Sequence, residues 1–283
     1  MRQTSSILFI AVDSLIPIRG KSIPGLDEFT ATLDHQGIPA VWLTSRSRLQ
    51  FDEPRRKLGH AHPFIAEDGC AAYLPEDYFH LRPESNLSKS QKASTIRLGR
   101  FTCIPVAEAL PAAADALETL SADTGVPVVT LRSLSLRELV QNTGLPEREA
   151  ELARQRDFDQ VFFLAGVSDL DVQRFLDGGR NRNLQLRQHG VFWSAAIGAS
   201  TQRCIRDLSK LYDRALRQHA HIVGMATKDL SPGLFPYCER TILLTNRSQD
   251  CDPADRAHSR TRRLELQAPD IWERVLEAIT TRN

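Results

Sequence analysis

Ile7-Leu8-Phe9-Ile10-Ala11-Val12-Asp13 is the stretch that decides the fold: an apolar run near the N-terminus, closed by an acid. A short run rich in branched side chains, with no polar position inside it, is typical of a strand buried on both faces of a parallel sheet. It is too short to span a bilayer or to form the core of a usual signal peptide. We therefore expect a central strand over residues 7–12, with Asp13 at its carboxyl end.

Helix and strand signals alternate through the first 75 residues. Apolar residues at helical spacing run from Gly25 to Gly37, where the second glycine ends the helix. The strands that follow are short apolar runs, at Ile38–Leu43, Pro63–Ala66 and Ala71–Leu74. Strands alternating with helices predict the α/β class, with a doubly wound parallel sheet.

Such a sheet binds ligands at the carboxyl ends of its strands. The polar residues that fall there are Asp13, Thr44, Ser45, Arg46, Ser47, Arg48, Glu67, Asp68 and Gly69. For Asp13 the alternatives are an acid/base residue and a cap for the following turn, and we favour the cap. Residues 44–48 either cradle an anion or cap a helix with both arginines solvated. Residues 67–69 are either a tight turn built on the glycine or a ligand contact.

A different pattern occupies the middle of the chain. A polar stretch near 82–95 is a candidate linker. The predicted elements beyond it are strands at Thr95–Phe101, Val126–Leu131, Val161–Leu164 and within Leu184–Ala196, and helices at Val106–Ala122, within Leu136–Arg156 and at Asp169–Leu176. The α/β alternation then resumes, at Cys204–Leu216, His221–Met225, Thr241–Thr245 and Ile271–Ile279. We expect a core domain of residues 1–85 and 197–283, with an α+β cap inserted at 86–196 and a ligand cleft between them.

The composition excludes several classes of function. Of the 283 residues, 41% are hydrophobic and 25% charged, with a net charge of +1, so no strong field would gather nucleic acid or an anionic membrane. The basic residues Arg256, Arg260, Arg262 and Arg263 are expected in a solvated loop. The five cysteines are widely spaced and include no Cys-x-x-Cys pair, which argues against a disulfide framework and a zinc site. We expect a cytoplasmic protein.

Several segments together resemble one family. Pro63-Phe64-Ile65-Ala66-Glu67-Asp68-Gly69, continued by Tyr73-Leu74-Pro75, resembles the PFIVENG…Y-L/I-P segment of the mannosyl-3-phosphoglycerate phosphatases. Residues 37–48 are similar to that family's GIPVV…T-x-K-T-R. Residues 139–146 and 156–159 resemble its T-G-L helix pair and its R-E-[YF]-D segment. The resemblance implies a HAD-like core with an α+β cap. Arg156 and Asp157 would then face the cleft, although a solvated helix end is the simpler expectation for them.

The resemblance also implies a mechanism. An Asp at the end of the first strand attacks phosphorus, and a second Asp two residues on acts as acid and then as base. A Thr binds the phosphoryl group, while a Lys and Mg²⁺ offset its charge. In this sequence Asp13 matches the acid/base residue and Thr44 matches the phosphoryl-binding Thr.

Three of the family's motifs are altered here. Ala11 stands at the position of the attacking Asp, and Thr201 stands at the position of the Lys. The metal loop falls on residues 224–235, where Thr227 and Ser231 occupy the positions of the acids. Asp229 is a nearby acid, and Lys228 beside it is unfavourable for Mg²⁺. Lys228 could instead replace the charge of the missing lysine.

We therefore expect a catalytically degenerate HAD-like phosphatase homologue, a pseudophosphatase that binds a ligand or regulates a partner. The candidate ligand-binding residues are Asp13, Thr44, Ser45, Arg46, Glu67, Asp68 and Lys228. No metal ligand and no cofactor are expected, and the partner would be a small phosphorylated ligand or a protein. The alternative is an active, Mg²⁺-dependent hydrolase of a phosphorylated sugar acid such as mannosyl-3-phosphoglycerate. A lyase or transferase that uses no metal has no supporting motif here, neither a Gly-rich phosphate loop nor G-x-S-x-G.

Overall fold

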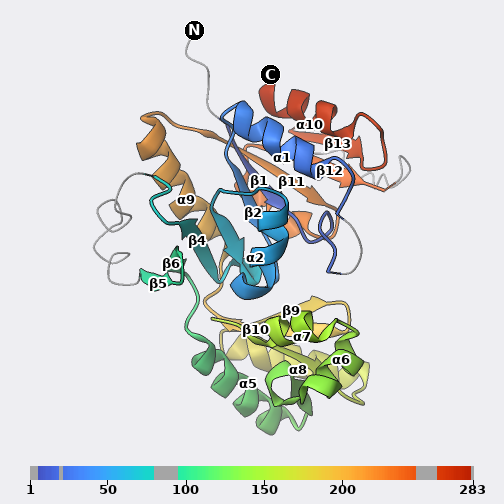
Figure 1. The fold of residues 1–283 in the computed structure, drawn as a ribbon. Helices are drawn as coiled ribbons and strands as arrows, with labels where there is room; N and C mark the ends of the chain where they lie inside the picture. The colour runs from blue at the N-terminus through green and yellow to red at the C-terminus, as the bar shows by residue number, and fades with distance from the viewer. Residues whose placement is uncertain (1–5, 19–21, 80–94, 247–259, 282–283) are drawn as a thin grey trace.

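Two sheets organise the protein (Figure 1). The computed structural model describes residues 6–18, 22–79, 95–246 and 260–281. In these ranges the larger sheet has the strand order β13-β12-β11-β1-β2-β3-β4-β6-β5. Its strands are β1 (Ser6–Ala11), β2 (Ala40–Leu43), β3 (Phe64–Ala66), β4 (Ala71–Pro75), β5 (Ile96–Leu98), β6 (Phe101–Pro105), β11 (His221–Thr227), β12 (Arg240–Thr245) and β13 (Thr261–Glu265). Because β1 lies inside the sheet and pairs in parallel with β2 and β11, the predicted α/β class is confirmed.

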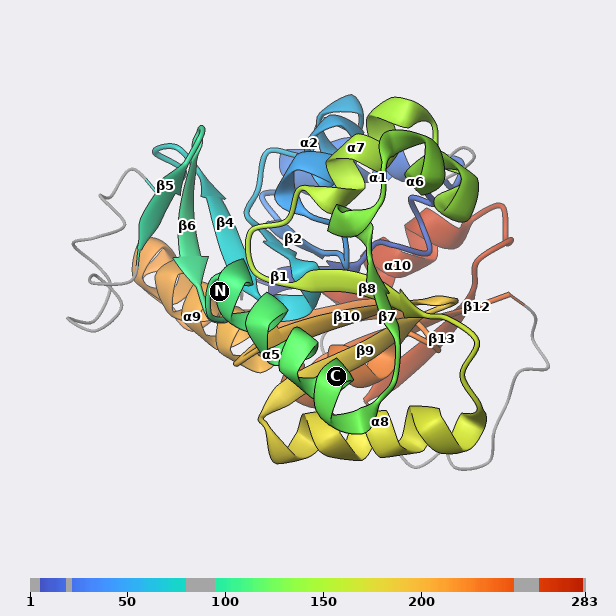
Figure 2. The same cartoon turned by 90° about the horizontal axis from the view of Figure 1, so that it is seen from below.

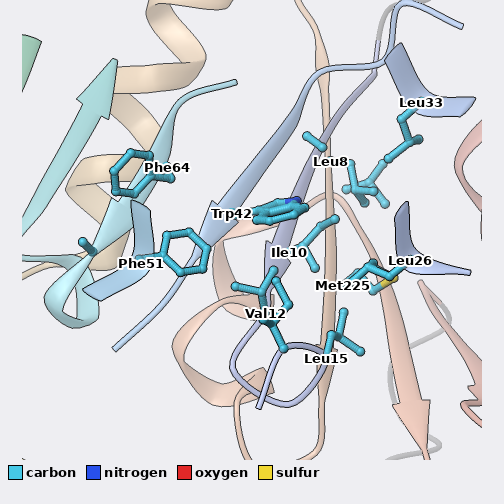
Figure 3. Packing of buried hydrophobic residues seen from close by; sticks show 14 of the residues in the cluster. Leu8, Ile10, Val12, Leu15, Leu26, Leu33, Trp42, Phe51, Phe64 and Met225 are labelled. Atoms are coloured by element: carbon cyan, nitrogen blue, oxygen red, sulfur yellow. The ribbon is translucent and has the colours of Figure 1, made fainter. Parts of the chain in front are cut away.

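Helices cover both faces of this sheet, which explains why β1 is apolar throughout. Leu8 and Ile10 point to the face covered by α1 (Leu26–His35), α2 (Arg48–Lys57) and α10 (Ile271–Thr280). Figure 3 shows these two residues among the large side chains of that layer. Ile7 and Phe9 point to the opposite face, against α9 (Thr201–Leu216). All four are at most 1% exposed, as expected for a strand between two helical layers.

The flank of the sheet beyond β3 is antiparallel. Strand β3 passes through a short 3₁₀ turn, Glu67–Gly69, into β4, and β6 then pairs with β4. Strands β5 and β6 fall inside the range 86–196 predicted for the cap, yet they hydrogen-bond into the core sheet. By strand pairing, the inserted cap therefore begins at α5 (Leu110–Thr124).

The cap is a four-stranded antiparallel sheet with helices on it. Its strands are β7 (Val128–Thr130), β8 (Gln160–Leu164), β9 (Leu184–His189) and β10 (Phe192–Ile197). Its helices are α5, α6 (Leu136–Thr143), α7 (Glu147–Arg154) and α8 (Asp169–Asn181). One face of the sheet packs on α5 and α8, with Phe162, Phe175 and Leu184 in the interface. Figures 1 and 2 both place α7 beside the core helix α2. The predicted helices and paired strands of this region are confirmed.

The basic stretch near the C-terminus departs from the prediction. Arg262 and Arg263, expected in a solvated loop, lie in β13, which pairs in parallel with β12 at the edge of the sheet. An edge strand is held by main-chain bonds and needs few apolar side chains, and here Leu264 is its buried residue. Arg256 and most of the linker predicted near 82–95 lie outside the described residues. In the parts of the chain that the structure describes, no helix is long and apolar enough to cross a membrane.

Candidate functional site

The carboxyl end of β1 places Asp13 against the end of β2. Thr44 donates a hydrogen bond from Oγ1 to one carboxylate oxygen of Asp13. Ser45 donates two to the other oxygen, from its N–H and its Oγ, each at 2.7 Å. The carboxylate therefore ties two strand ends together. This corrects our preference for Asp13 as the cap of the turn after β1, which is held by the main chain between Val12 and Leu15.

The groups around Asp13 are of the kind that would cradle a phosphate. Hydroxyls and a backbone N–H converge on one point at a strand end, as an anion site requires. In this chain the anion in the cradle is Asp13 itself, with a side chain that is only 21% exposed. A phosphate would have to take Thr44 and Ser45 away from Asp13 and would meet its negative charge. The observed geometry therefore disfavours a phosphoryl group at this point.

Arg46 lies beside this cradle and is buried. It is 4% exposed and donates from Nη2 to the carbonyl oxygen of Ile16. Its Nε lies 3.8 Å from Asp13 Oδ1 and has no hydrogen-bond partner among the described residues. Burial lowers the pKa of Arg46, against the opposing charge of Asp13. Of the two alternatives for residues 44–48, the one with a solvated Arg46 and a cap from Thr44 or Ser45 is wrong, because Arg46 is buried and the residue that caps α2 is Ser47.

The other positions at which the family has catalytic residues place no charged side chain against Asp13. Ala11 is 7% exposed and packs in the apolar layer against α9. Thr201 donates to the carbonyl oxygen of Asp68 at 3.4 Å, so it is a packing residue of the turn before β4. Thr227, at the end of β11, donates to Ser14 Oγ at 3.3 Å. Lys228 follows it and is exposed, as is its neighbour Asp229.

The residues present do not fit the Mg²⁺ that the family implies. That ion needs oxygen ligands, several of them carboxylates, gathered at one point. Both oxygens of Asp13 already accept hydrogen bonds, and Asp229 is exposed in the loop after β11. Among the residues that the structure describes, no group of three or more His, Cys, Asp or Glu could hold a metal ion.

Glu67 holds the cap onto the core. It is fully buried, and its carboxylate accepts hydrogen bonds from the backbone N–H groups of Asp157, Phe158 and Asp159 at 2.8–3.0 Å. Burial and the charge of Asp159 raise the pKa of Glu67 to about 8, while Arg156 and the amides oppose this rise. The side chain thus satisfies three donors of one cap segment, at a position where the sequence offered a turn or a ligand contact.

Asp68 bonds to the cap sheet. Its Oδ2 lies 2.7 Å from His189 Nε2 and 3.5 Å from Ser194 Oγ, on the face of the cap sheet opposite α5 and α8. Burial alone would lower the pKa of His189, but the hydrogen bond and charge of Asp68 outweigh it and raise the pKa. Arg187 also donates to the carbonyl oxygen of Asp68. The predicted site residue Asp68 is therefore part of an ionic contact between core and cap.

Arg156 and Asp157 complete this contact. Arg156 donates from Nη2 to the carbonyl oxygen of Ser45 at 2.6 Å and pairs with the buried carboxylate of Asp159. Burial would lower the pKa of Arg156, but the charges of Asp159 and Glu67 outweigh it and raise the pKa. Asp157 accepts a bond from Arg48 at 3.2 Å. The expectation of a solvated helix end is therefore wrong for both residues.

The structure thus gathers six of the seven predicted ligand-binding residues along one seam between core and cap. Five of the six make the contacts described above: Thr44 and Ser45 bond to Asp13, whereas Glu67 and Asp68 bond to the cap. The sixth is Arg46, and the exposed Lys228 makes no ion pair with a described residue. Sequence reasoning missed His189 and Arg187, for which the only signal was their position in a strand with alternating polar residues.

Comparison with known proteins gives relatives of low identity, and no family model matches the chain. It is 23% identical over 206 residues to a glucosyl-3-phosphoglycerate/mannosyl-3-phosphoglycerate phosphatase of Methanococcoides burtonii, covering 73% of this chain and 70% of that protein. The protein of the same name from Persephonella marina is 24% identical over 208 residues, covering 72% and 70%. The resemblance found in the sequence is therefore confirmed.

Solved structures agree on the fold. A HAD-superfamily phosphatase from Bacteroides thetaiotaomicron superposes with a TM-score of 0.64 at 12% identity, over 99% of this chain and 97% of that one. A protein from Thermotoga maritima gives 0.61 at 12% identity, over 98% of both chains. A HAD subclass IIB sugar phosphatase gives 0.59 at 12% identity, over 96% and 98%. The chain has the HAD fold with a cap domain, as predicted.

Proposed function

We propose that this chain is a catalytically degenerate HAD-fold protein that binds a ligand or regulates a partner. One observation carries the proposal: the cradle at the end of β1 is filled by the chain's own Asp13, and Ala11 stands where the attacking carboxylate would be. Covalent phosphate-ester hydrolysis in this fold requires a nucleophile, and an alanine side chain has no lone pair. A cytoplasmic location and a phosphorylated or protein partner belong to this proposal.

The electrostatics of the seam support the same proposal. Phosphoryl transfer needs positive charge aimed at the transferring oxygens. Here Arg46 donates to a backbone carbonyl, Arg156 is paired with Asp159, and Thr201 packs against the turn at Asp68. Arg46 and Thr201 thus make contacts within the core, and Arg156 binds the cap to the core through the carbonyl oxygen of Ser45, so none of the three is free to bind a phosphoryl group.

Phosphate release from the full-length chain tests the proposal. The assay would use Mg²⁺ with mannosyl-3-phosphoglycerate, glucosyl-3-phosphoglycerate and simple sugar phosphates. Wild type is expected to release no phosphate above the blank. Ala11→Asp is expected to restore little, since Thr201 and Thr227 remain, and Ala11→Asn is its matched control. Steady turnover by wild type would overturn the proposal.

The second candidate is an active hydrolase of a phosphorylated sugar acid. It is favoured by the likeness over about 70% of the chain to curated phosphatases named for such substrates. Under this alternative Asp13 would act in catalysis after releasing Thr44 and Ser45. The same assay would then give turnover that Asp13→Asn abolishes. A loss of turnover in Asp229→Asn would show in addition that the loop after β11 takes part.

A further inference from the structure

A cavity of about 250 Å³ lies outside the Asp13 cradle, between the core and the cap. Its walls come from the loop after β1, from α2 and from the cap helix α7. Ile16, Pro54 and Leu58 are among the residues that form its apolar side. The volume is slightly below that of usual ligand pockets, so it suits a small metabolite.

The polar side of the cavity contains groups with unmet hydrogen-bonding capacity. Gln50 is 4% exposed, and its side-chain amide bonds to none of the described residues. Arg46 also lines the cavity, with a buried Nε that lacks a partner within the same ranges. Buried polar groups are normally satisfied, so the unpartnered Nε of Arg46 beside the cavity points to a ligand with acceptor atoms, and the amide of Gln50 offers a second donor there.

The opposite charge enters from the cap. Glu149 on α7 lines the cavity and is partly buried, and it makes no ion pair with a residue that the structure describes. The other acid of the lining, Glu53, is already engaged by Lys57 at 2.8 Å and by Arg148 at 3.1 Å. The lining therefore presents donors on the core side and, on the cap side, one carboxylate that makes no ion pair with a described residue, although its charge opposes the lowering of the pKa of Arg46.

We propose that this cavity binds a small zwitterion with an apolar body, of the class of aliphatic α-amino acids. Its carboxylate would accept hydrogen bonds from Arg46 and Gln50, and its ammonium would pair with Glu149. The aliphatic side chain would lie against Ile16, Pro54 and Leu58. An inorganic or sugar phosphate fits less well, because it has no ammonium for Glu149 and would bring additional negative charge into a lining that already contains Glu53 and Glu149.

Such a ligand would connect the two lobes. Arg46 and Gln50 belong to the core, whereas Glu149 belongs to the cap, so one bound molecule would hold α7 against α2. This gives the proposed non-catalytic protein a ligand class, and its biological meaning rests on that proposed function. Binding itself is measured without turnover. A phosphatase activity would therefore contradict the proposed function without contradicting the proposed binding site.

Calorimetric titration of the full chain with L-leucine tests the site. Two analogues each remove one charge: L-leucinamide lacks the carboxylate, and 4-methylpentanoate lacks the ammonium. L-leucine is expected to bind, and each analogue to bind at least about 10-fold more weakly, the loss of one charge-assisted hydrogen bond. Absence of binding by L-leucine and L-valine would overturn the proposal. Glucose or inorganic phosphate binding more tightly than L-leucine would also overturn it.

Variants on α7 locate the site. Glu149→Gln keeps the shape of the side chain and is expected to weaken L-leucine at least about 10-fold, without changing 4-methylpentanoate. Glu147→Gln is the matched control, since Glu147 is exposed on the same helix and outside the lining. Circular dichroism would verify that both variants fold. Unchanged L-leucine affinity in Glu149→Gln would refute the assignment.

Discussion

Replacing Glu67 tests whether one side chain holds the cap to the core. In Glu67→Ala the backbone N–H groups of Asp157, Phe158 and Asp159 lose their acceptor. Phe158 and Asp159 are at most 3% exposed, so their amides are shielded from bulk water when the carboxyl group of Glu67 is removed. An unsatisfied buried donor costs about 1–3 kcal/mol, so the variant should lose about 2–6 kcal/mol of unfolding free energy. That is a large share of the total stability of a typical protein.

Glu67→Gln separates the hydrogen bonds from the charge. A glutamine keeps one acceptor oxygen, so near pH 6 it should cost only about 1 kcal/mol. With a folded pKa of about 8, above the ordinary 4.5, Glu67 keeps a proton that the unfolded chain has released. Its contribution is therefore complete below pH 4.5 and is lost as pH rises through 8, on the order of a few kcal/mol. At pH 9 the Gln variant should equal or exceed wild type in stability.

Urea unfolding followed by circular dichroism at pH 5, 7 and 9 measures both effects. Glu76→Ala is the control, because Glu76 is exposed and pairs with Arg97 at the surface, where a change costs about 0.5 kcal/mol or less. If Glu67→Ala lowers the free energy of unfolding by less than about 1 kcal/mol, Glu67 does not hold the cap to the core. A gap between wild type and Glu67→Gln that stays constant from pH 5 to pH 9 would show instead that Glu67 is already ionised in the folded protein.

Three further predictions concern the same seam. Gly69→Ala would place a Cβ 2.5 Å from the backbone nitrogen of Thr201, at a residue with a φ of +89°, so thermal unfolding should show that the free energy of unfolding falls by more than about 2 kcal/mol. Gly59→Ala is the control: its φ is also positive but no atom of the described residues lies near the new Cβ, so it should cost about 1 kcal/mol. His189→Gln should melt at a lower temperature than wild type at pH 6, and this difference should become smaller at pH 8.5. The reason is that the raised pKa of His189 allows a charged hydrogen bond with Asp68 at low pH, and this bond is lost when the imidazole is deprotonated. A difference that does not change with pH would contradict this. Tyr73→Phe removes the hydrogen bond to Asp157 at 3.0 Å and should lose about 1 kcal/mol in urea, whereas no change would mean that water replaces it.

Local patterning was sufficient for most of the elements. The strand predicted from the first apolar run and the helix predicted before Gly37 agree with β1 and α1 to within a few residues. In the cap, the helix after Ser135 begins with a capping box that local sequence defines. These features depend on neighbours a few positions apart, which is why a single sequence contains them. Strand β13 was missed because edge pairing leaves little mark on side-chain pattern.

The roles of the predicted site residues depended on contacts over long distances in the chain. Asp13 meets Thr44 across 31 residues, and Glu67 meets the amide of Phe158 across 91. A strand-end acid has the same local sequence whether it faces a ligand or a neighbouring strand. The pattern therefore left cradle, cap and turn open as alternatives for these positions.

The sequence by itself determined the α/β class, the order of the elements and the replacement of a carboxylate by Ala11, because each follows from residue type and spacing. Only the tertiary structure decided that Asp13 occupies the cradle, that Glu67 and Asp68 bind the cap, and that Gln50 and Glu149 share a cavity. The physical reason is that hydrogen bonds and ion pairs depend on distances of about 3 Å. Those distances are set by the packing of two lobes, which local sequence does not specify.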